Sequence, residues 1–431
     1  MLTIKLAMRS LWRHRMRTIF TLCAIGLGHM FFLIFMTMSD GGLADMVELA
    51  IKQGSAGHVV VQAKGYQKAR SVELLVPDGA RIRQTIQAKL PKAAVVLRTF
   101  GGGLARSSSE SVGVFFSGVE PRLEREVSHL SKVIKRGVYL GADEAAIRRA
   151  EKKPGALWCA RPPKKDAPQA HPIIVGEQLA RTLRLNLCEK LVLDVQGMGD
   201  RESGEFRVVG IFRTGSADVD TSFVQIPLPD AQRLLHIGDS VHQVAVLLAS
   251  ADESHAAASV IKKAVGRRDA LEILPWDEAI PEMADFVWFK KVSGYFFIAI
   301  VIFIVGIGVL NTVFMSVMER SREIGVMRAL GTRPGQVLRL VLAEGAVIGA
   351  IGVVVGIALA LPLVHYLETT GIRYQKPMEA AGVVVESFKG KLYLSSLVGG
   401  SLAVFFITLV SAIPPAIRAA RIHVLRAIQQ N

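Results

Sequence analysis

The sequence predicts a membrane protein with four transmembrane α-helices and a large α+β domain inserted between the first and the second of them. Three observations support this fold class. Four long stretches contain no charged side chain, the chain between the first two alternates strand-like and helix-like patterns, and most excess positive charge borders the apolar stretches. Of the 431 residues, 51% are hydrophobic and 21% are charged, which suits an integral membrane protein with a large water-exposed part.

Each charge-free stretch is long enough to cross a bilayer. The stretches are residues 18–39, 292–318, 345–367 and 392–417, which contain 22, 27, 23 and 26 residues. A transmembrane helix needs about 20 predominantly apolar residues. The alternative for the first stretch is a cleaved signal peptide, but such peptides have an apolar core of roughly 7–15 residues and a small-x-small cleavage site, which residues 38–41 do not provide. We therefore expect an uncleaved anchor.

The distribution of positive charge predicts the topology. Residues 1–17 carry five basic and no acidic side chains, residues 319–344 carry five arginines and three glutamates, and residues 418–431 carry three arginines. These segments account for +10 of the formal net charge of +15, whereas residues 40–291 account for only +4. By the positive-inside rule both termini and 319–344 lie in the cytoplasm, and 40–291 and the short loop 368–391 lie outside. The basic balance therefore reflects topology and not nucleic-acid binding.

Residues 319–331 form a charged segment directly after the second apolar stretch. Its charges have both signs and belong to Glu319, Arg320, Arg322, Glu323 and Arg328. Gly331, followed closely by Pro334, is expected to stop the helix. We interpret this segment as a docking element for a cytoplasmic partner protein. The alternative is a juxtamembrane helix whose arginines only fix the topology, and charge alone does not decide between the two.

The sequence contains no motif for nucleotide binding or catalysis. It lacks a P-loop, His-Glu-x-x-His, Cys-x-x-Cys and Gly-x-Ser-x-Gly, so we expect no catalytic residues, no metal and no cofactor in this chain. The four apolar stretches also lack the acidic and basic side chains that commonly couple transport to ions. A transporter of this composition must take its energy from another subunit, so the chain is expected to be a non-catalytic subunit.

Residues 1–17 are predicted to form an amphipathic cytoplasmic helix, and residues 40–291 an α+β domain. In that domain we expect strands at 58–62, 93–99, 111–119, 173–175, 190–196, 205–213, 222–226, 242–248 and 271–274, and helices at 78–90, 176–184, 229–236, 252–265 and 277–290. The glycine run 101–103 is predicted to be a loop and residues 151–172 an exposed insertion.

Three further features concern packing and the cysteines. Gly349, Gly352 and Gly356 share one face of the third apolar stretch and predict close helix packing, and His29 is expected to be packed or hydrogen-bonded. Cys159 and Cys188 fall in the external domain. They form a disulfide if that compartment is oxidising, or remain two unpaired thiols.

The run from Gly306 to Gly331, with Glu344, Gly345 and the glycines of the third stretch, resembles the permease superfamily that contains MacB, FtsX and LolC/LolE. The layout of four spans and one large external domain is similar as well. The external domain looks most similar to the LolC/LolE lipoprotein-releasing branch. The runs that carry this resemblance are residues 118–121, 137–140, 176–180, 206–212 and 229–235. The sequence departs from that branch at Cys188, where a Gly-Asp turn is usual, at His423, and at residues 196–204, which are shorter than the carrier-binding hook of LolC.

The resemblance implies an ABC transporter permease that pairs with a second permease copy or paralogue and clasps a cytoplasmic ATPase dimer, which binds the ATP. It implies that the external domain is periplasmic, with a porter-like part (40–120 and 245–291) and an inserted sabre-like part (121–244). ATPase coupling is then expected to involve Glu319, Arg320, Arg322, Glu323, Arg328 and Gly331.

The resemblance also implies a substrate. In the lipoprotein-releasing branch, lipid chains enter a cavity lined by the first two spans, which here would be faced by Phe31, Phe35, Met36, Tyr295, Phe296 and Phe303. Ordinary membrane and helix packing is the alternative for these side chains. The expected function is release of lipoproteins from the bacterial inner membrane, with a periplasmic carrier or adaptor as a further partner. The alternatives are MacB-like efflux of drugs or peptides and FtsX-like regulation of an external enzyme.

Overall fold

The computed structural model describes residues 15–53, 57–151, 157–160, 171–266, 269–380 and 383–422. The chain divides into two compact units. The helical unit contains residues up to 45, residues 287–374 and residues from 387 onward, and the α+β unit contains residues 46–286 and 375–386. Almost all of the predicted amphipathic helix at 1–17 and most of the tail at 418–431, including His423, lie outside the described residues.

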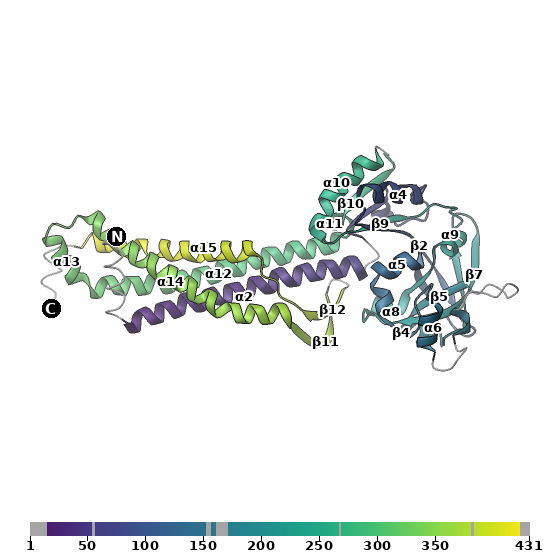
Figure 1. Cartoon of the computed structure of the whole chain (residues 1–431), viewed down its shortest axis with the longest axis horizontal. Coiled ribbons are helices and arrows are strands. Elements are labelled where there is room, and N and C mark those ends of the chain that lie inside the picture. The colour runs from purple at the N-terminus through teal and green to yellow at the C-terminus, as the bar shows by residue number, and fades with distance from the viewer. Residues whose placement is uncertain are drawn as a thin grey trace. The chain divides into compact units, whose positions relative to one another are not determined.

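Four helical segments of the described residues are long and apolar enough to cross a membrane. Three of them contain a predicted stretch whole, and the fourth, which begins at Leu394, contains all but the first two residues of the stretch 392–417. They are supplied by α2 (Arg15–Gln53), α12 (Pro281–Glu319), α14 (Pro334–Thr369) and the pair α15 (Leu394–Ser411) and α16 (Ile413–Ala420). The short helix α13 (Ser321–Ala329) lies between α12 and α14 in the chain (Figure 1). The prediction of four transmembrane helices is therefore confirmed at the level of secondary structure.

The last apolar stretch is divided into two helices at Ala412. Pro414 and Pro415 occupy the first turn of α16, where their missing amide hydrogens leave no helical hydrogen bond unmade. The chain leaves the first helix at Ala412 and starts the second directly afterwards.

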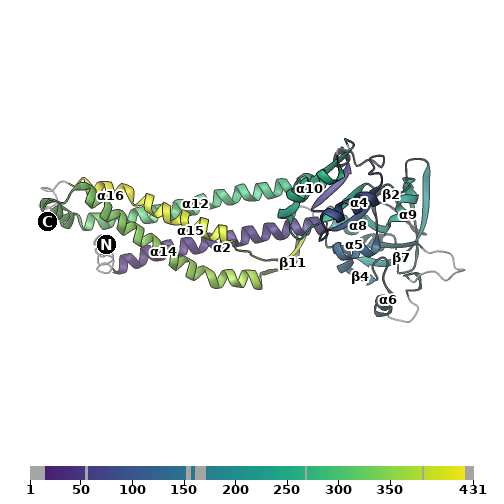
Figure 2. The same ribbon diagram turned by 45° about the horizontal axis from the view of Figure 1, so that its top comes forward.

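The glycines of α14 lie where its neighbours approach closely. A Cβ atom on Gly352 would lie 2.6 Å from Cγ2 of Ile25, and one on Gly356 would lie 2.7 Å from Cβ of His29, both on α2. On the same helix, a Cβ on Gly349 would lie 3.0 Å from Cγ2 of Thr408 on α15. Figure 2 shows α14 running beside α2 and α15. The glycines therefore serve helix packing, as predicted.

His29 joins three helices of the helical unit. Its side chain is fully buried, Nδ1 lies 3.2 Å from the carbonyl oxygen of Val353 on α14, and Nε2 lies 3.2 Å from Oγ of Ser401 on α15. The prediction of a hydrogen-bonded, packed histidine is confirmed.

The α+β unit contains a ten-stranded sheet. Its strands are β1 (Val59–Ala63), β2 (Ala94–Arg106), β3 (Ser111–Val119), β4 (Ile134–Gly137), β5 (His171–Gly176), β6 (Lys190–Gln196), β7 (Arg201–Phe212), β8 (Phe223–Pro227), β9 (Gln243–Leu247) and β10 (Leu271–Pro275). All nine predicted strands are confirmed. The short strand β4 was not predicted, because its sequence Ile-Lys-Arg-Gly lacks an apolar alternation of useful length.

The helices of this unit are more numerous than predicted. The predicted ones correspond to α4 (Gly79–Lys89), α7 (Glu177–Thr182), α9 (Leu228–Leu235) and α10 (Ser254–Val265). The helices α3 (Tyr66–Ala69), α5 (Pro121–Val127), α6 (Glu144–Ala150) and α8 (Ala217–Ser222) were missed, since each is shorter than the window over which helical periodicity is visible.

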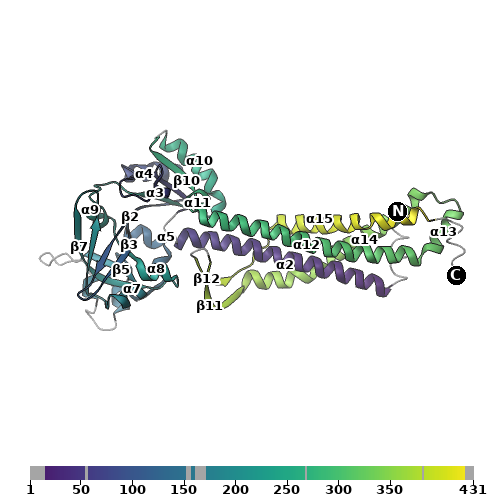
Figure 3. The same ribbon diagram turned by 180° about the vertical axis from the view of Figure 1, so that it is seen from behind.

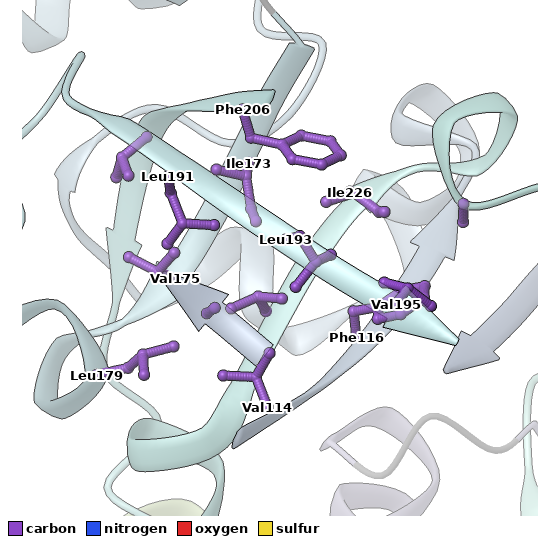
Figure 4. Packing of buried hydrophobic residues seen from close by; sticks show 14 of the residues in the cluster. Val114, Phe116, Ile173, Val175, Leu179, Leu191, Leu193, Val195, Phe206 and Ile226 are labelled. Carbon is purple, nitrogen blue, oxygen red and sulfur yellow. The ribbon is translucent and has the colours of Figure 1, made fainter. Parts of the chain in front are cut away.

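Part of the sheet closes on itself around a hydrophobic core. Strands β2, β3, β8, β5, β7 and β6 each pair with the next, and β6 pairs back to β2. Closure leaves no free edge within this ring. Figure 4 shows side chains such as Phe116, Leu193 and Phe206 packed against one another inside it. The helices α7 and α9 contribute Leu179 and Leu234 to the same core.

A second core lies against the other end of the sheet. Strands β10, β1, β9 and the first half of β2 form an antiparallel arrangement, and α4 and α10 pack on it (Figure 3). Ile82 and Ile86 of α4 and Ile261 of α10 are buried in this core. The division into porter-like and sabre-like parts at the predicted residues stays a prediction.

The glycine run 101–103 is not a loop, contrary to the prediction, but the middle of β2. Gly101 pairs with Phe116 and Gly103 with Val114 on β3, and β2 changes its other partner from β9 to β6 across this run. A Cβ on Gly103 would lie 2.4 Å from the carbonyl oxygen of Asp194 on β6. Glycine permits this close backbone approach, which is why a strand interior here carries residues that otherwise indicate a loop.

Three other predictions are corrected. Residues 368–391 are not merely a short loop, because β11 (Ile372–Ala380) and β12 (Val383–Phe388) form a two-stranded sheet there. The helix predicted at 277–290 is broken at Ile280 into α11 (Trp276–Ala279) and α12, where Pro281 starts a new helix. The insertion at 151–172 is not wholly exposed, since Leu157 and Cys159 are buried by apolar neighbours.

Cys159 and Cys188 are bonded to each other in the structure, with their Cα atoms 5.5 Å apart and 29 residues of separation. In the chain-entropy account, closing a loop of this length stabilises the fold by about 3–4 kcal/mol. Cys188 has a φ of 65°, in the left-handed region that favours glycine. The backbone therefore explains why a glycine is usual at this position in the branch that the sequence resembles.

His242 holds two segments of the α+β unit together without carrying a charge. The backbone amide of Phe100 donates to its Nδ1 at 3.2 Å, so Nε2 carries the proton and donates to the carbonyl oxygen of Val72, also at 3.2 Å. Burial lowers the pKa of His242 from 6.5 to about 4, because the charged form loses its hydration.

We expect the α+β unit to lose about 3 kcal/mol of unfolding free energy between pH 6.5 and pH 4 through His242. Above pH 6.5 the ring is neutral in both states, and as the pH falls towards 4 only the unfolded chain takes up the proton. Urea unfolding of the purified chain, followed by tryptophan fluorescence across this range, measures the effect. The variant His242→Gln should show a smaller slope, and an unchanged slope would contradict the assignment.

Candidate functional site

The charged segment after α12 forms a helix–turn–helix connection at the end of the helical unit. Helix α12 ends at Glu319, and Arg320, with φ −98° and ψ 11°, leads into α13. Helix α13 ends in a Schellman motif. The amide of Thr332 donates to the carbonyl of Met327 and that of Gly331 to the carbonyl of Arg328, each at 3.1 Å, while Gly331 has a φ of 95°. The predicted helix stop at Gly331 is thereby confirmed.

Two arginines of this segment point into the helical unit. Arg320 donates to Oε2 of Glu323 at 3.2 Å and to Oε1 of Glu344 on α14 at 2.9 Å. Arg328 donates to the carbonyl oxygens of Ala420 and Ile422 at 3.0 and 2.9 Å. These carbonyls lie at the C-terminal end of α16, where helical carbonyls lack intrahelical partners and a cation is favourable. Arg320 and Arg328 therefore fix α13 to α14 and α16.

The opposite face of α13 is exposed and mixes charge with apolar surface. Arg322, Val326 and Leu330 follow one another at intervals of four residues, and Leu330 is 83% exposed. Arg322 makes no hydrogen bond or ion pair with any residue that the structure describes. By contrast Ile324, on the inner face, is buried among Val337 and Val341 of α14. Arginine is enriched in protein interfaces, and exposed apolar side chains beside it offer surface that a protein partner could cover.

The structure separates the predicted coupling residues into two groups. Glu319, Arg322 and Glu323 lie on the surface, whereas Arg320 and Arg328 make the inward contacts, and Gly331 ends the helix. Sequence reasoning left two features out of the candidate site: the exposure of Val326 and Leu330, and Glu344 as the partner of Arg320. A carboxylate directly before the third apolar stretch was the available signal, because a buried charge there requires a partner.

A small polar recess adjoins Glu344. It is lined by hydroxyls from α2 and α12, namely those of Thr18, Thr21, Thr312 and Ser316, together with Glu344 and Gly345 of α14. The recess and the Arg320–Glu344 pair together place polar groups from three helices at one end of the helical unit.

Four of the six predicted substrate-facing side chains are exposed. Phe31, Tyr295, Phe296 and Phe303 are each at least 60% exposed. Phe35 instead stacks on Phe297 with ring centroids 4.1 Å apart, and Met36 packs beside the cluster that contains Phe32 and Leu33. That the exposed aromatics face a substrate stays a prediction.

Family models account for most of the chain. Residues 18–264 match the MacB-like periplasmic core domain, and residues 295–424 match the FtsX-like permease C-terminal domain. The chain belongs to the MacB/FtsX family of ABC transporter permeases. Neither matching model is an ATPase domain. The α+β unit between the first two long helices is therefore a MacB-like periplasmic domain, and the chain is a multi-pass membrane protein.

Relatives that are named for different functions are similar to this permease. The lipoprotein-releasing system transmembrane protein LolC of Neisseria meningitidis is 23% identical over 53% of this chain and 55% of its own length. The ABC transporter permease YtrF of Bacillus subtilis is 32% identical over 33% of each chain. The pyoverdine export ATP-binding/permease protein PvdT of Pseudomonas aeruginosa is 35% identical over 30% of this chain and 17% of its own. The chain thus spans about half or less of the length of these relatives.

We expect Arg328→Ala to lower the unfolding free energy of the helical unit by about 2 kcal/mol or more, because the carbonyls of Ala420 and Ile422 lose their charged donor. Arg322→Ala should leave it unchanged within about 0.5 kcal/mol, since that side chain has no described partner. Thermal unfolding of the detergent-solubilised variants measures both. Equal destabilisation by the two substitutions would contradict the division into inward and outward arginines.

Proposed function

We propose that this permease is the membrane subunit of an ATP-driven transporter whose ATPase subunits dock on α13. The observation that carries the proposal is the arrangement around α13, which is held from the inside by Arg320 and Arg328 while it presents Arg322, Val326 and Leu330 outward. To transmit motion, α13 must be attached by one face to the membrane helices and leave its other face free to bind the ATPase. Family membership supports an ATPase as that second element.

The predicted topology also supports transmission of motion from the cytoplasmic side to the α+β unit. With the positive segments in the cytoplasm, both termini and α13 lie inside and the α+β unit lies outside a bacterial inner membrane. Helices α2 and α12 are each 39 residues long, and both contribute residues to the α+β unit. Glu48 near the end of α2 contacts His58 at 3.1 Å and accepts from the amide of Ala251 at 3.2 Å. Motion of either helix would therefore act on the periplasmic unit.

We further propose that the substrate is a lipoprotein released from the inner membrane. The similarity to LolC supports this choice, and so do the exposed aromatics Phe31, Tyr295, Phe296 and Phe303 on the first two long helices. In a pair of permeases these side chains would offer apolar surface to acyl chains.

MacB-like export of a small molecule or peptide is the second candidate. It is supported by the higher local identity with a pyoverdine export protein, 35% against 23% for LolC, although over a shorter part of the chain. An FtsX-like regulator of an external enzyme would use the same docking face, because the FtsX-like match at residues 295–424 includes α13.

We expect Arg322→Glu combined with Leu330→Asp to weaken ATPase association by about tenfold or more, because both the charge and the apolar contact of the outward face are inverted. Co-purification and ATPase activity of the reconstituted complex measure the effect. Arg122→Glu, an equal charge reversal on the exposed surface of α5, is the matched control. Normal association of the double variant would contradict docking on α13.

Depletion of the permease distinguishes the substrates. Lipoprotein release predicts that mature lipoproteins accumulate in the inner membrane, and that Phe31→Ala with Phe303→Ala reduces release while ATPase association persists. Unchanged lipoprotein sorting would overturn the lipoprotein proposal. Increased sensitivity to exported compounds would then favour export, and a defect in cell-wall hydrolysis would favour regulation.

A further inference from the structure

A pocket on the α+β unit lies between α7, β4 and the residues that follow α7. Its volume is about 290 Å³, close to the lower limit of about 300 Å³ that is typical of small-molecule sites. The apolar part of its lining comes from Ala180, Leu185 and Ile211, all of which are buried. None of the motifs discussed above includes this pocket.

The polar part of the lining is strongly basic. Arg136, Arg181 and Arg184 line the pocket, and Glu177 is the one carboxylate among its described lining residues. That carboxylate already accepts from Arg181 at 2.9 Å and lies 3.6 Å from Nε of Arg213, so two arginines neutralise it. Arg136 donates to Oδ1 of Asn186 at 3.4 Å and makes no other hydrogen bond or ion pair with a residue that the structure describes, so most of its donors remain available.

Arg184 occupies a backbone position that favours glycine. The amide of Leu185 donates to the carbonyl of Ala180 at 2.8 Å and that of Arg184 to the carbonyl of Arg181 at 3.2 Å, which is the pattern of a helix C-terminal Schellman motif. Arg184 itself has a φ of 53°. A side chain in this conformation is strained, and glycine or asparagine would terminate α7 without that strain.

We propose that this pocket binds a phosphate group carried on a small organic ester or a lipid headgroup. Planar guanidinium groups form paired charge-assisted hydrogen bonds with phosphate oxygens. Arg136 and Arg184 line this pocket beside a carboxylate that Arg181 and Arg213 already neutralise. Leu185 and Ile211 provide apolar surface for the carbon skeleton of the ester. The site does not depend on docking of an ATPase at α13, so the two proposals stand or fall separately.

Calorimetric titration of the full chain in a non-ionic detergent tests the site with three probes. The probes are inorganic phosphate, glycerol 3-phosphate and short-chain dihexanoyl phosphatidylglycerol, with glycerol as the uncharged control. We expect saturable binding to at least one phosphate probe that weakens as the salt concentration rises from about 0.05 M to about 0.5 M. Stronger binding of the phospholipid assigns the phosphate to a headgroup, and equal or stronger binding of glycerol 3-phosphate assigns it to a soluble ester.

The variant Arg136→Gln with Arg184→Gly should weaken this binding by about tenfold or more, since two charged donors are removed. Arg184→Gly also relieves the left-handed strain, so the melting temperature of that single variant should not fall below the parent value. Arg149→Gln, on the exposed face of α6, is the matched control and should bind normally. Absence of binding to every phosphate probe, or binding that the double variant leaves intact, would overturn the proposal.

Discussion

The helical unit depends on the close approach of α14 to its neighbours. Gly352 and Gly356 allow α2 to approach α14 closely, and Gly345 and Gly349 allow the chain of α15 and α16 to do so. Each glycine lacks the Cβ atom that would collide with the neighbouring segment. Apolar side chains alone do not drive association within lipid, so close backbone contact and a few polar contacts must specify the packing. His29, bonded to both α14 and α15, is one such polar contact.

The same helix positions the candidate coupling segment. Glu344 directly precedes the first glycine of the packing face and holds Arg320 at the start of α13. Arg328 holds the other end of α13 through the carbonyls of Ala420 and Ile422 at the C-terminal end of α16. Displacement of α13 would therefore pull on α14 and α16 together. The segment owes this property to arginines that face inward, whereas the docking that we propose would use the outward residues Arg322 and Leu330.

In the periplasmic unit a short glycine run likewise permits a close approach between backbones. Residues 101–103 let β2 leave β9 and join β6, which closes the ring of strands around Phe116 and Phe206. Helix α7 packs on that ring through Leu179 and Leu183, and so carries Arg181 and Arg184 to the rim of the basic pocket.

The sequence by itself determined the four spans, the inserted α+β domain, its principal strands and the end of α13 at Gly331. These follow from hydrophobic runs, strand alternation and helix-stop chemistry, which are local properties. The partner of Arg320, the inward orientation of Arg328, the strand at 101–103 and the convergence of Arg136 with Arg184 were decided only by the tertiary structure. Each of these joins residues distant in the chain, and a linear pattern carries no information about which distant segments will meet.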